Sequence, residues 1–438
     1  MEGQNSPIEG LYPFQHEAVN AWAEEGHVGL LEMATGTGKT RTACACVSAI
    51  MELGTAFIIV VVPSVHIGKQ WIEELRPLGP IEINGSNPSW ERTFRRELRQ
   101  ISFGHGSHMV AVAVMNTAAT QRFIELAQQA ANQVENTLFV GDEVHWLGAS
   151  EFQRALVPFA NFRLGLSATP NRYFDDEGTG ILKAYFGEKP VYEMPLRKAL
   201  KTEKPNGELL LTPYEYKPRF VSLTDEEVER YRKFAKTMAR YSNPQNFDPQ
   251  RVKNARLGAS RIVKKAEAKA AALGDLLDEL GESLHFALIY CEDSDQMNTA
   301  REQLHSRGIF FGEITEAESS ADRQKVLSDF SNGYLDVILA MRCLDEGVDI
   351  PEARIGIILA SSGNPREFIQ RRGRLMRTSP GKHSALIYDF AVLATPEILE
   401  GTGLNSIKDK ELARIAEFSD DAMNAEAVVA SVANLWVL

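Results

Sequence analysis

Short apolar runs alternate with helix-forming stretches in two separate blocks of the sequence. The first block contains VGLLEM (28–33), AFIIVVV (56–62), MVAVAVM (109–115), TLFVGDE (137–143) and FRLGLS (162–167). The second contains HFALIYC (285–291), DVILAM (336–341), RIGIILA (354–360) and SALIYDF (384–390). Such alternation is typical of parallel sheets covered by helices. The sequence therefore predicts an α/β fold with two parallel-sheet domains in tandem.

The segments outside these two blocks have a helical character. Residues 224–243 begin with a threonine that can cap a helix and continue with an acidic first turn, and residues 251–280 and 408–436 are also typical of helix. We expect the last of these segments to pack back on a core. The predicted parts are an α/β domain over 1–198, a helical spacer over 199–278, a second α/β domain over 279–400 and a C-terminal helical extension over 401–438.

The stretch MATGTGKT follows the first apolar run and precedes a helical segment. Its end, Gly38-Lys39-Thr40, matches the phosphate-loop pattern GxxxxGK[ST], with Met33 at the usual place of the first glycine. In such a loop, backbone N–H groups hold a triphosphate, the lysine meets the β and γ phosphates, and the hydroxyl is offered to Mg²⁺. A glycine-rich turn without chemistry is the alternative. We predict ATP and Mg²⁺ as cofactors, with the nucleotide held by Thr35, Gly36, Thr37, Gly38, Lys39 and Thr40.

Two adjacent acids, Asp142 and Glu143, end an apolar run downstream of this loop. The carboxyl edge of a parallel sheet faces the ligand crevice, so this is a suitable place for a metal carboxylate. We predict that Asp142, with Thr40, orients the Mg²⁺ shell and that Glu143 positions and deprotonates the attacking water. A solvated strand end is the alternative. His145 is predicted to couple the nucleotide site to two further residues, Ser167 and Thr169.

Eight motifs follow one another within residues 12–377. They are MATGTGKT, VVVPSVHIGKQW, VAVMNTAA, GDEVHWLG, LSATP, ALIYC, AMRCLDEGVDIPEA and IQRRGRLMR. Together they resemble the motifs of the superfamily 2 helicases and translocases, in the family's order. The match is to the DEVH-type branch, which includes XPB-like repair helicases, UvsW-like phage helicases and the motors of type I and type III restriction enzymes. The resemblance implies two RecA-like domains, with ATP in the cleft between them and nucleic acid running across both.

The same resemblance implies further nucleotide contacts. CLDEGVDIP resembles the motif whose Gly347 and Asp349 would sense the nucleotide, and LYPFQHEAV resembles the adenine-side motif, with Gln15 reading the adenine edge. QRRGRLMR resembles the last family motif and assigns catalytic roles to Gln370, Arg374 and Arg377. Arg374 and Arg377 are our choice for arginine fingers, because a guanidinium stabilises charge that spreads over the departing γ-phosphoryl group. Alternatively, this arginine run binds backbone phosphates, as Arg366 and Arg371 could do in either case.

Nucleic-acid contacts are predicted from the family's track motifs. The residues in question are Pro63, Gln70, Asn116 and Thr315, and Asn116 departs from the threonine that is common in the family. The formal net charge of −12 argues against indiscriminate binding of polyanions, but it does not exclude local basic patches. Residues 251–270 hold seven basic residues against one acid, and a second basic cluster lies at Arg92, Arg95, Arg96 and Arg99. Each cluster is either a nucleic-acid contact or a solvated helix face.

The predicted function is an ATP-dependent DNA helicase or translocase that acts on single- or double-stranded DNA. RNA is the alternative partner, in a remodelling ATPase that unwinds nothing, and an ATP-dependent switch subunit of a larger complex is a third interpretation. No nuclease element is evident, so a role in restriction, defence or repair requires a nuclease or another partner protein. The N-terminus lacks a basic start and an apolar core, and no run of 18 apolar residues occurs. We therefore expect a cytoplasmic protein without a membrane partner.

Overall fold

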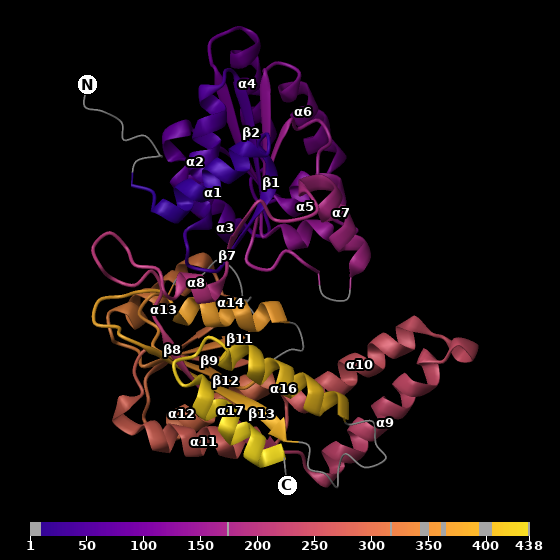
Figure 1. The fold of residues 1–438 in the computed structure, drawn as a ribbon, viewed down its shortest axis with the longest axis vertical. Helices are drawn as coiled ribbons and strands as arrows, with labels where there is room; N and C mark the ends of the chain where they lie inside the picture. The colour runs from indigo at the N-terminus through magenta and orange to yellow at the C-terminus, as the bar shows by residue number, and fades with distance from the viewer. Residues whose placement is uncertain are drawn as a thin grey trace. The chain divides into compact units, whose positions relative to one another are not determined.

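The computed structural model describes residues 10–172, 175–315, 318–341, 350–360, 365–393 and 405–436. The chain divides into two compact units, Met1–Leu210 and Leu211–Leu438. Each unit is built on its own parallel sheet with helices packed against it (Figure 1). The predicted fold class, two parallel-sheet α/β domains in tandem with additional helices, is confirmed. Every described helix is either too short or too polar to cross a membrane.

The first unit contains a seven-stranded sheet in the order β3-β4-β2-β5-β6-β1-β7. All of its paired neighbours are parallel. The strands are β1 (Val28–Met33), β2 (Ala56–Val62), β3 (Ile81–Ile83), β4 (His108–Val114), β5 (Asn136–Asp142), β6 (Phe162–Ser167) and β7 (Tyr192–Met194). The helices are α1 (Pro13–Glu24), α2 (Lys39–Glu52), α3 (Val65–Glu74), α4 (Trp90–Ser102), α5 (Met115–Ala118), α6 (Gln121–Ala131), α7 (Asp176–Phe186) and α8 (Leu196–Ala199).

The second unit contains a six-stranded sheet in the order β10-β11-β9-β12-β13-β8, again with parallel neighbours. The strands are β8 (Tyr214–Ser222), β9 (Ala287–Cys291), β10 (Phe311–Ile314), β11 (Val337–Met341), β12 (Ile355–Ile358) and β13 (Ala385–Leu393). The helices are α9 (Asp225–Ser242), α10 (Pro249–Lys264), α11 (Ala268–Leu280), α12 (Ser294–Ser306), α13 (Ser320–Ser331), α14 (Pro365–Leu375), α16 (Asn405–Ser419) and α17 (Ala425–Trp436).

The α9–α10 hairpin consists of these two helices and the turn that joins them. It extends away from the sheet of the second unit (Figure 1). Thr224 caps α9 as predicted, and Glu227 forms a capping box with it. Val228 and Tyr231 of α9 and Ile262 of α10 are buried in the core of the second unit, so the base of the hairpin is fixed to the sheet.

The range predicted as a helical spacer, 199–278, contains one strand that the sequence analysis missed. β8 pairs with β13 along its whole length and forms an edge of the second sheet. An edge strand tolerates Pro218, which cannot donate a ladder hydrogen bond. The C-terminal helices pack back on a core as predicted, because Ile407 of α16 joins the buried cluster of the second unit.

Because all strands of each sheet are parallel, their carboxyl ends lie at one edge. In the first unit, the phosphate loop follows β1, Asp142 ends β5 and Ser167 ends β6, and these three strands belong to one sheet in the order β5-β6-β1. The sheet therefore brings together motifs that are far apart in the sequence, at the edge where α/β proteins bind their ligands.

Candidate nucleotide site

The phosphate loop joins β1 to α2 through two glycines in the left-handed region. Gly36 has a φ of 83° and Gly38 a φ of 82°, which non-glycine residues rarely adopt. The loop is closed by the Thr37 hydroxyl, which donates to the Ala34 carbonyl at 2.7 Å. Lys39 Nζ donates to the Met33 carbonyl at 3.2 Å, so its ammonium group lies across the loop. Amides, a helix N-terminus and one cation thus gather as phosphate binding requires.

Gln15 of α1 is bonded to the phosphate loop. Its Nε2 donates to the carbonyl oxygens of Thr37 at 3.1 Å and Gly38 at 3.4 Å, and its Oε1 accepts from the Tyr12 amide at 2.9 Å. A Cβ at Gly38 would lie 2.6 Å from this Nε2, which would have to shift, and the φ of 82° further disfavours any other residue there. The side chain therefore positions the loop, while the contact with adenine stays a prediction.

Asp142 is buried at the end of β5 and accepts two hydrogen bonds. Trp71 Nε1 donates to its Oδ2 at 2.8 Å, and the Glu143 amide donates to its Oδ1 at 3.0 Å. Burial raises the pKa of Asp142, and the bond from Trp71 and the charge of Lys39 oppose that rise. A desolvated carboxylate beside the phosphate loop suits a divalent cation, which favours its charged form. The donor set of Asp142 and the Thr40 hydroxyl therefore fits Mg²⁺.

Glu143 adopts the left-handed conformation, with a φ of 46°, immediately after the strand. For a residue with a side chain this is a strained backbone conformation of the kind that clusters at functional sites. The Oε2 atom of Glu143 lies 3.5 Å from Nδ1 of the buried His145. The same nitrogen lies 3.5 Å from the Ser167 hydroxyl, which accepts from the Thr169 amide at 3.0 Å. The side chains of Glu143, His145 and Ser167 thus form a series of contacts, which Thr169 joins through its backbone amide, while the predicted coupling role of His145 stays a prediction.

Arg172 was not singled out by the sequence analysis, although it follows LSATP by two residues. Its guanidinium donates to the His145 carbonyl and, through Nε, to Asp175 Oδ2 at 2.6 Å. Its amide also donates to the Thr179 hydroxyl at 3.0 Å. Arg172 therefore ties the loop after β5 to the loop and helix after β6.

The residues predicted to contact nucleic acid lie beyond strands of the same two sheets. Pro63 follows β2 and Asn116 follows β4, and these strands pair up to Val62 and Val114. Asn116 and Gln70 of α3 are exposed and Pro63 is half-buried. In the second unit, Thr315 follows β10, and its hydroxyl donates to Glu318 Oε1 at 2.8 Å. These contacts with nucleic acid remain predictions.

Helix α14 carries most of the predicted arginine motif. Arg374 is 6% exposed, whereas Gln370 and Arg377 are half-buried. Arg371 is also buried and donates to the Ala360 carbonyl at 2.6 Å, and its possible contact with a nucleic-acid phosphate stays a prediction. The side chain of Arg366 lies outside the described residues, as do Gly347 and Asp349.

The two basic clusters are partly neutralised within their own units. In the first cluster, the intramolecular contacts are Arg251 with Asp248, Lys264 with Glu292, Lys265 with Asp293 and Asp295, and Lys269 with two carbonyl groups. In the second, Arg95 and Arg96 pair with Glu91 and Glu97. Each segment therefore offers fewer positive charges to a polyanion than its formal charge suggests.

Trp71→Phe tests whether the hydrogen bond from Trp71 orients Asp142 as a metal ligand. The substitution removes the hydrogen bond to a buried carboxylate, so we expect unfolding to become easier by about 1–3 kcal/mol. The apparent affinity for Mg²⁺ in ATP hydrolysis should fall about tenfold, as is typical when the group that orients a metal ligand is lost. Urea unfolding and a Mg²⁺ titration of ATPase activity measure the two effects. Trp22→Phe is the matched control, since Trp22 is equally buried but donates to the Arg163 carbonyl. An equal loss of Mg²⁺ affinity in Trp22→Phe would contradict the role of Trp71 in orienting Asp142.

Two protein families match successive parts of the chain. The family described as Type III restriction enzyme, res subunit, matches residues 9–172, and the helicase conserved C-terminal domain matches residues 268–379. The first match covers the phosphate loop, Asp142, Glu143 and the LSATP motif, and the second includes Arg374 and Arg377.

Two relatives match most of the chain. The DNA 3'-5' translocase XPB2 of Sulfurisphaera tokodaii is 27% identical over 391 residues, 84% of this chain and 78% of that protein. The putative DNA 3'-5' helicase Rad25 of Halobacterium salinarum is 27% identical over 394 residues, 88% of this chain and 55% of that protein. Among solved structures, the ATP-dependent Type ISP restriction-modification enzyme LlaBIII bound to DNA has the same fold. It superposes with a TM-score of 0.63 at 17% identity and covers 93% of this chain and 29% of that one.

Proposed function

The chain belongs to the superfamily 2 helicases and translocases, and we propose that it is an ATP-driven motor that moves along DNA or separates its strands. The observation that carries the proposal is the assembly at one sheet edge of the phosphate loop, Asp142, and the Glu143–His145–Ser167 series. A parallel sheet bearing an arginine-rich helix follows in the second unit, as this enzyme class requires.

In the proposed mechanism, the loop amides and the N-terminus of α2 bind the triphosphate. Lys39 moves from the Met33 carbonyl to the β and γ phosphates. Thr40 and Asp142 would hold Mg²⁺, which neutralises charge on the phosphates when bound. Glu143 takes the proton of the attacking water, and its contact with His145 links this step to Ser167. Arg374 and Arg377 are proposed to stabilise the charge that develops on the γ-phosphoryl oxygens.

DNA is the proposed substrate because XPB2 and Rad25, which match 84% and 88% of this chain, carry it in their names. By the same reasoning we propose movement in the 3'-5' direction. RNA is the alternative substrate. A switch that binds ATP without turnover is less favoured, since Lys39, Asp142 and Glu143 are all present and assembled. The chain covers 55% of Rad25 and 29% of LlaBIII. We also propose that it acts in a restriction, defence or repair system together with a nuclease or another partner protein.

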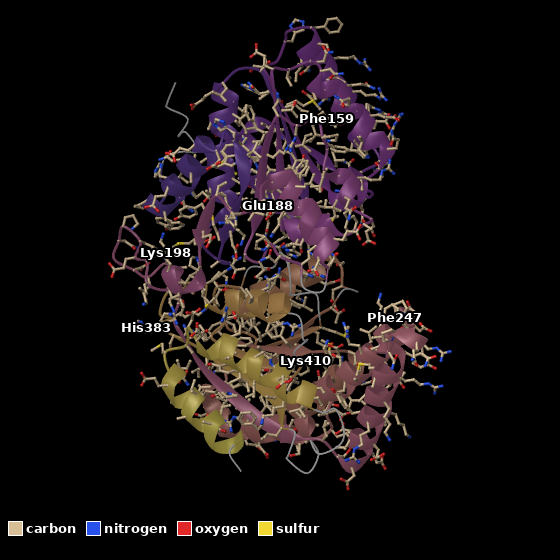
Figure 2. All side chains as sticks on the ribbon, turned by 45° about the vertical axis from the view of Figure 1, so that its right-hand side comes forward. Phe159, Glu188, Lys198, Phe247, His383 and Lys410 are labelled. Atoms are coloured by element: carbon tan, nitrogen blue, oxygen red, sulfur yellow. The ribbon has the colours of Figure 1, made fainter. Side chains whose placement is uncertain are left out.

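The outer part of the α9–α10 hairpin is the proposed additional contact with DNA. Between Lys236 and Arg256 it carries five exposed basic residues and one acid, Asp248. Phe247 lies at its tip with 65% of its surface exposed (Figure 2). Cations bind the phosphate backbone without regard to sequence, as a motor must, and an exposed aromatic ring can stack on a base.

Steady-state ATPase assays with single-stranded DNA, duplex DNA and RNA test the proposal directly. We expect at least one form of DNA to stimulate hydrolysis more strongly than RNA of equal length, with stimulation that weakens as salt increases. Lys39→Ala serves as the inactive reference, because it removes the cation that meets the phosphates. Equal rates with and without every nucleic acid would overturn the motor proposal, and stimulation by RNA alone would favour the alternative.

A further inference from the structure

Lys269, the second residue of α11, is a buried lysine that the mechanism above does not use. It is 3% exposed, and its Nζ donates to the Leu359 carbonyl at 2.6 Å and to the Lys264 carbonyl at 3.3 Å. Lys264 is the last residue of α10, and Leu359 directly follows β12. The Lys269 ammonium group therefore connects the end of α10 to the residue that follows β12.

Lys269 bonds to the residue that follows β12, and the next helix in the chain is α14, which carries Arg374. The Leu359 amide donates to the Tyr290 carbonyl of β9 at 3.2 Å, which extends the sheet pairing by one residue. The next carbonyl, that of Ala360, accepts from Arg371 of α14 at 2.6 Å. The Arg371 guanidinium also lies 5.1 Å from the centre of the Tyr290 ring. Two consecutive carbonyls are thus held by two cations, one from α11 and one from the helix that carries Arg374.

The other side of Lys269 is fixed to the base of the hairpin. The Lys264 carbonyl also accepts from Gln296 Nε2 of α12 at 3.0 Å, and the Lys264 ammonium donates to Glu292 Oε2 at 2.9 Å. At the start of α9, the buried Glu227 accepts from the Glu267 amide at 3.0 Å, two residues before Lys269. Both hairpin helices are therefore bonded to the short break between α10 and α11.

We propose that Lys269 is a positioning residue that couples the α9–α10 hairpin to α14, so that DNA held by the hairpin alters the placement of Arg374 and the rate of ATP hydrolysis. The inference rests on the proposed function, since it needs both a hairpin that contacts DNA and an arginine that acts on ATP. Lys269 touches neither ligand: it acts through the carbonyl groups of Lys264 and Leu359. A displacement at one carbonyl group is expected to reach the other through this cation, because breaking either bond leaves a buried ammonium group with fewer partners, which is costly.

The surroundings of Lys269 give the coupling a distinctive pH dependence. Burial lowers the pKa of Lys269 to about 8, with Glu411 and Asp389 opposing that shift and Arg414 and Lys264 adding to it. Below this pH the bonds to the carbonyls are charge-assisted, and above it they are made by a neutral amine and are weaker. Stimulation by DNA should therefore decline as the pH rises through about 8.

The test compares Lys269→Met with Lys265→Met in the full chain. Lys265 lines the same cavity of about 230 Å³ but pairs with Asp293 and Asp295 and not with Leu359. ATPase rates are measured without DNA and with saturating DNA, and DNA affinity is measured by fluorescence anisotropy. We expect Lys269→Met to keep basal turnover and DNA affinity, while the ratio of stimulated to basal rates falls about tenfold, within the range for coupling residues. Lys265→Met should keep the wild-type ratio.

Lys269→Arg keeps the inference testable if Lys269→Met does not fold. Lys269 lines the cavity described above, and the guanidinium that replaces its ammonium group stays charged at every pH used. We expect this variant to retain stimulation and to lose the decline above about pH 8. An unchanged ratio in Lys269→Met, a parallel loss of basal rate and stimulation, or identical pH profiles for wild type and Lys269→Arg would each overturn the inference. Absence of stimulation in the wild type would instead refute the proposed function.

Discussion

Replacing Glu143 by glutamine is expected to lower the turnover number for ATP by about 10²- to 10⁴-fold, the usual contribution of a general base. The amide has nearly the same shape as the carboxylate but cannot accept the proton of the attacking water. The substitution leaves the phosphate loop and Lys39 untouched, and the backbone bond from residue 143 to Asp142 does not involve the altered side chain. Nucleotide affinity should therefore stay within a few fold, as measured with a fluorescent ATP analogue alongside steady-state hydrolysis.

Glu135→Gln is the matched control for this experiment. Glu135 is exposed and directly precedes the amino end of β5, the strand that Glu143 directly follows. The same chemical change at the opposite end of one strand should leave both turnover and nucleotide affinity unchanged. Normal hydrolysis by Glu143→Gln would remove Glu143 from the role of general base, and loss of nucleotide binding would show that its role is structural.

The buried strands could be predicted from the sequence because both faces of these parallel sheets are covered. Strands such as β2 are then continuous apolar runs, and β1, β2 and β6 have the bounds that the composition indicated. Strands β3 and β7 have three residues each and β10 has four, which is too short for a periodic pattern. Strand β8 contains Pro218 and half-buried positions, and its pairing with β13 spans some 170 residues of chain. No short sequence pattern predicts a pairing between strands so far apart in the chain.

In the candidate nucleotide site, too, residues in local sequence motifs could be predicted, whereas residues that matter through distant partners could not. The phosphate loop and the acid pair are local patterns, and the sheet brings them together as the parallel topology requires. Trp71 and Arg172 were missed, because their importance arises from partners 71 and 27 residues away. The only signal for Trp71 was a tryptophan inside a family motif, and for Arg172 a charged residue next to LSATP. A run of arginines does not reveal which members are buried, as Arg371 and Arg374 are here.

Arg374→Ala is expected to lower DNA-stimulated turnover by about 10³- to 10⁵-fold, the effect of removing an arginine finger where one acts. The physical reason is that charge spreads over the γ-phosphoryl oxygens only as the bond breaks, so the guanidinium stabilises the transition state more than bound ATP. Arg374 belongs to the second unit and the phosphate loop to the first, so binding of nucleotide should survive. Arg219→Ala is the control, because Arg219 forms a surface ion pair with Glu279 in the same second unit.

We propose that ATP held by the first unit is hydrolysed only with a group supplied by the second. Nucleotide affinity and DNA-stimulated hydrolysis, measured on one preparation of Arg374→Ala, test this requirement. We expect wild-type affinity for the ATP analogue together with loss of hydrolysis at saturating DNA, whereas Arg219→Ala should behave as the wild type. Full DNA-stimulated hydrolysis by Arg374→Ala would show that the arginine of the second unit is not required.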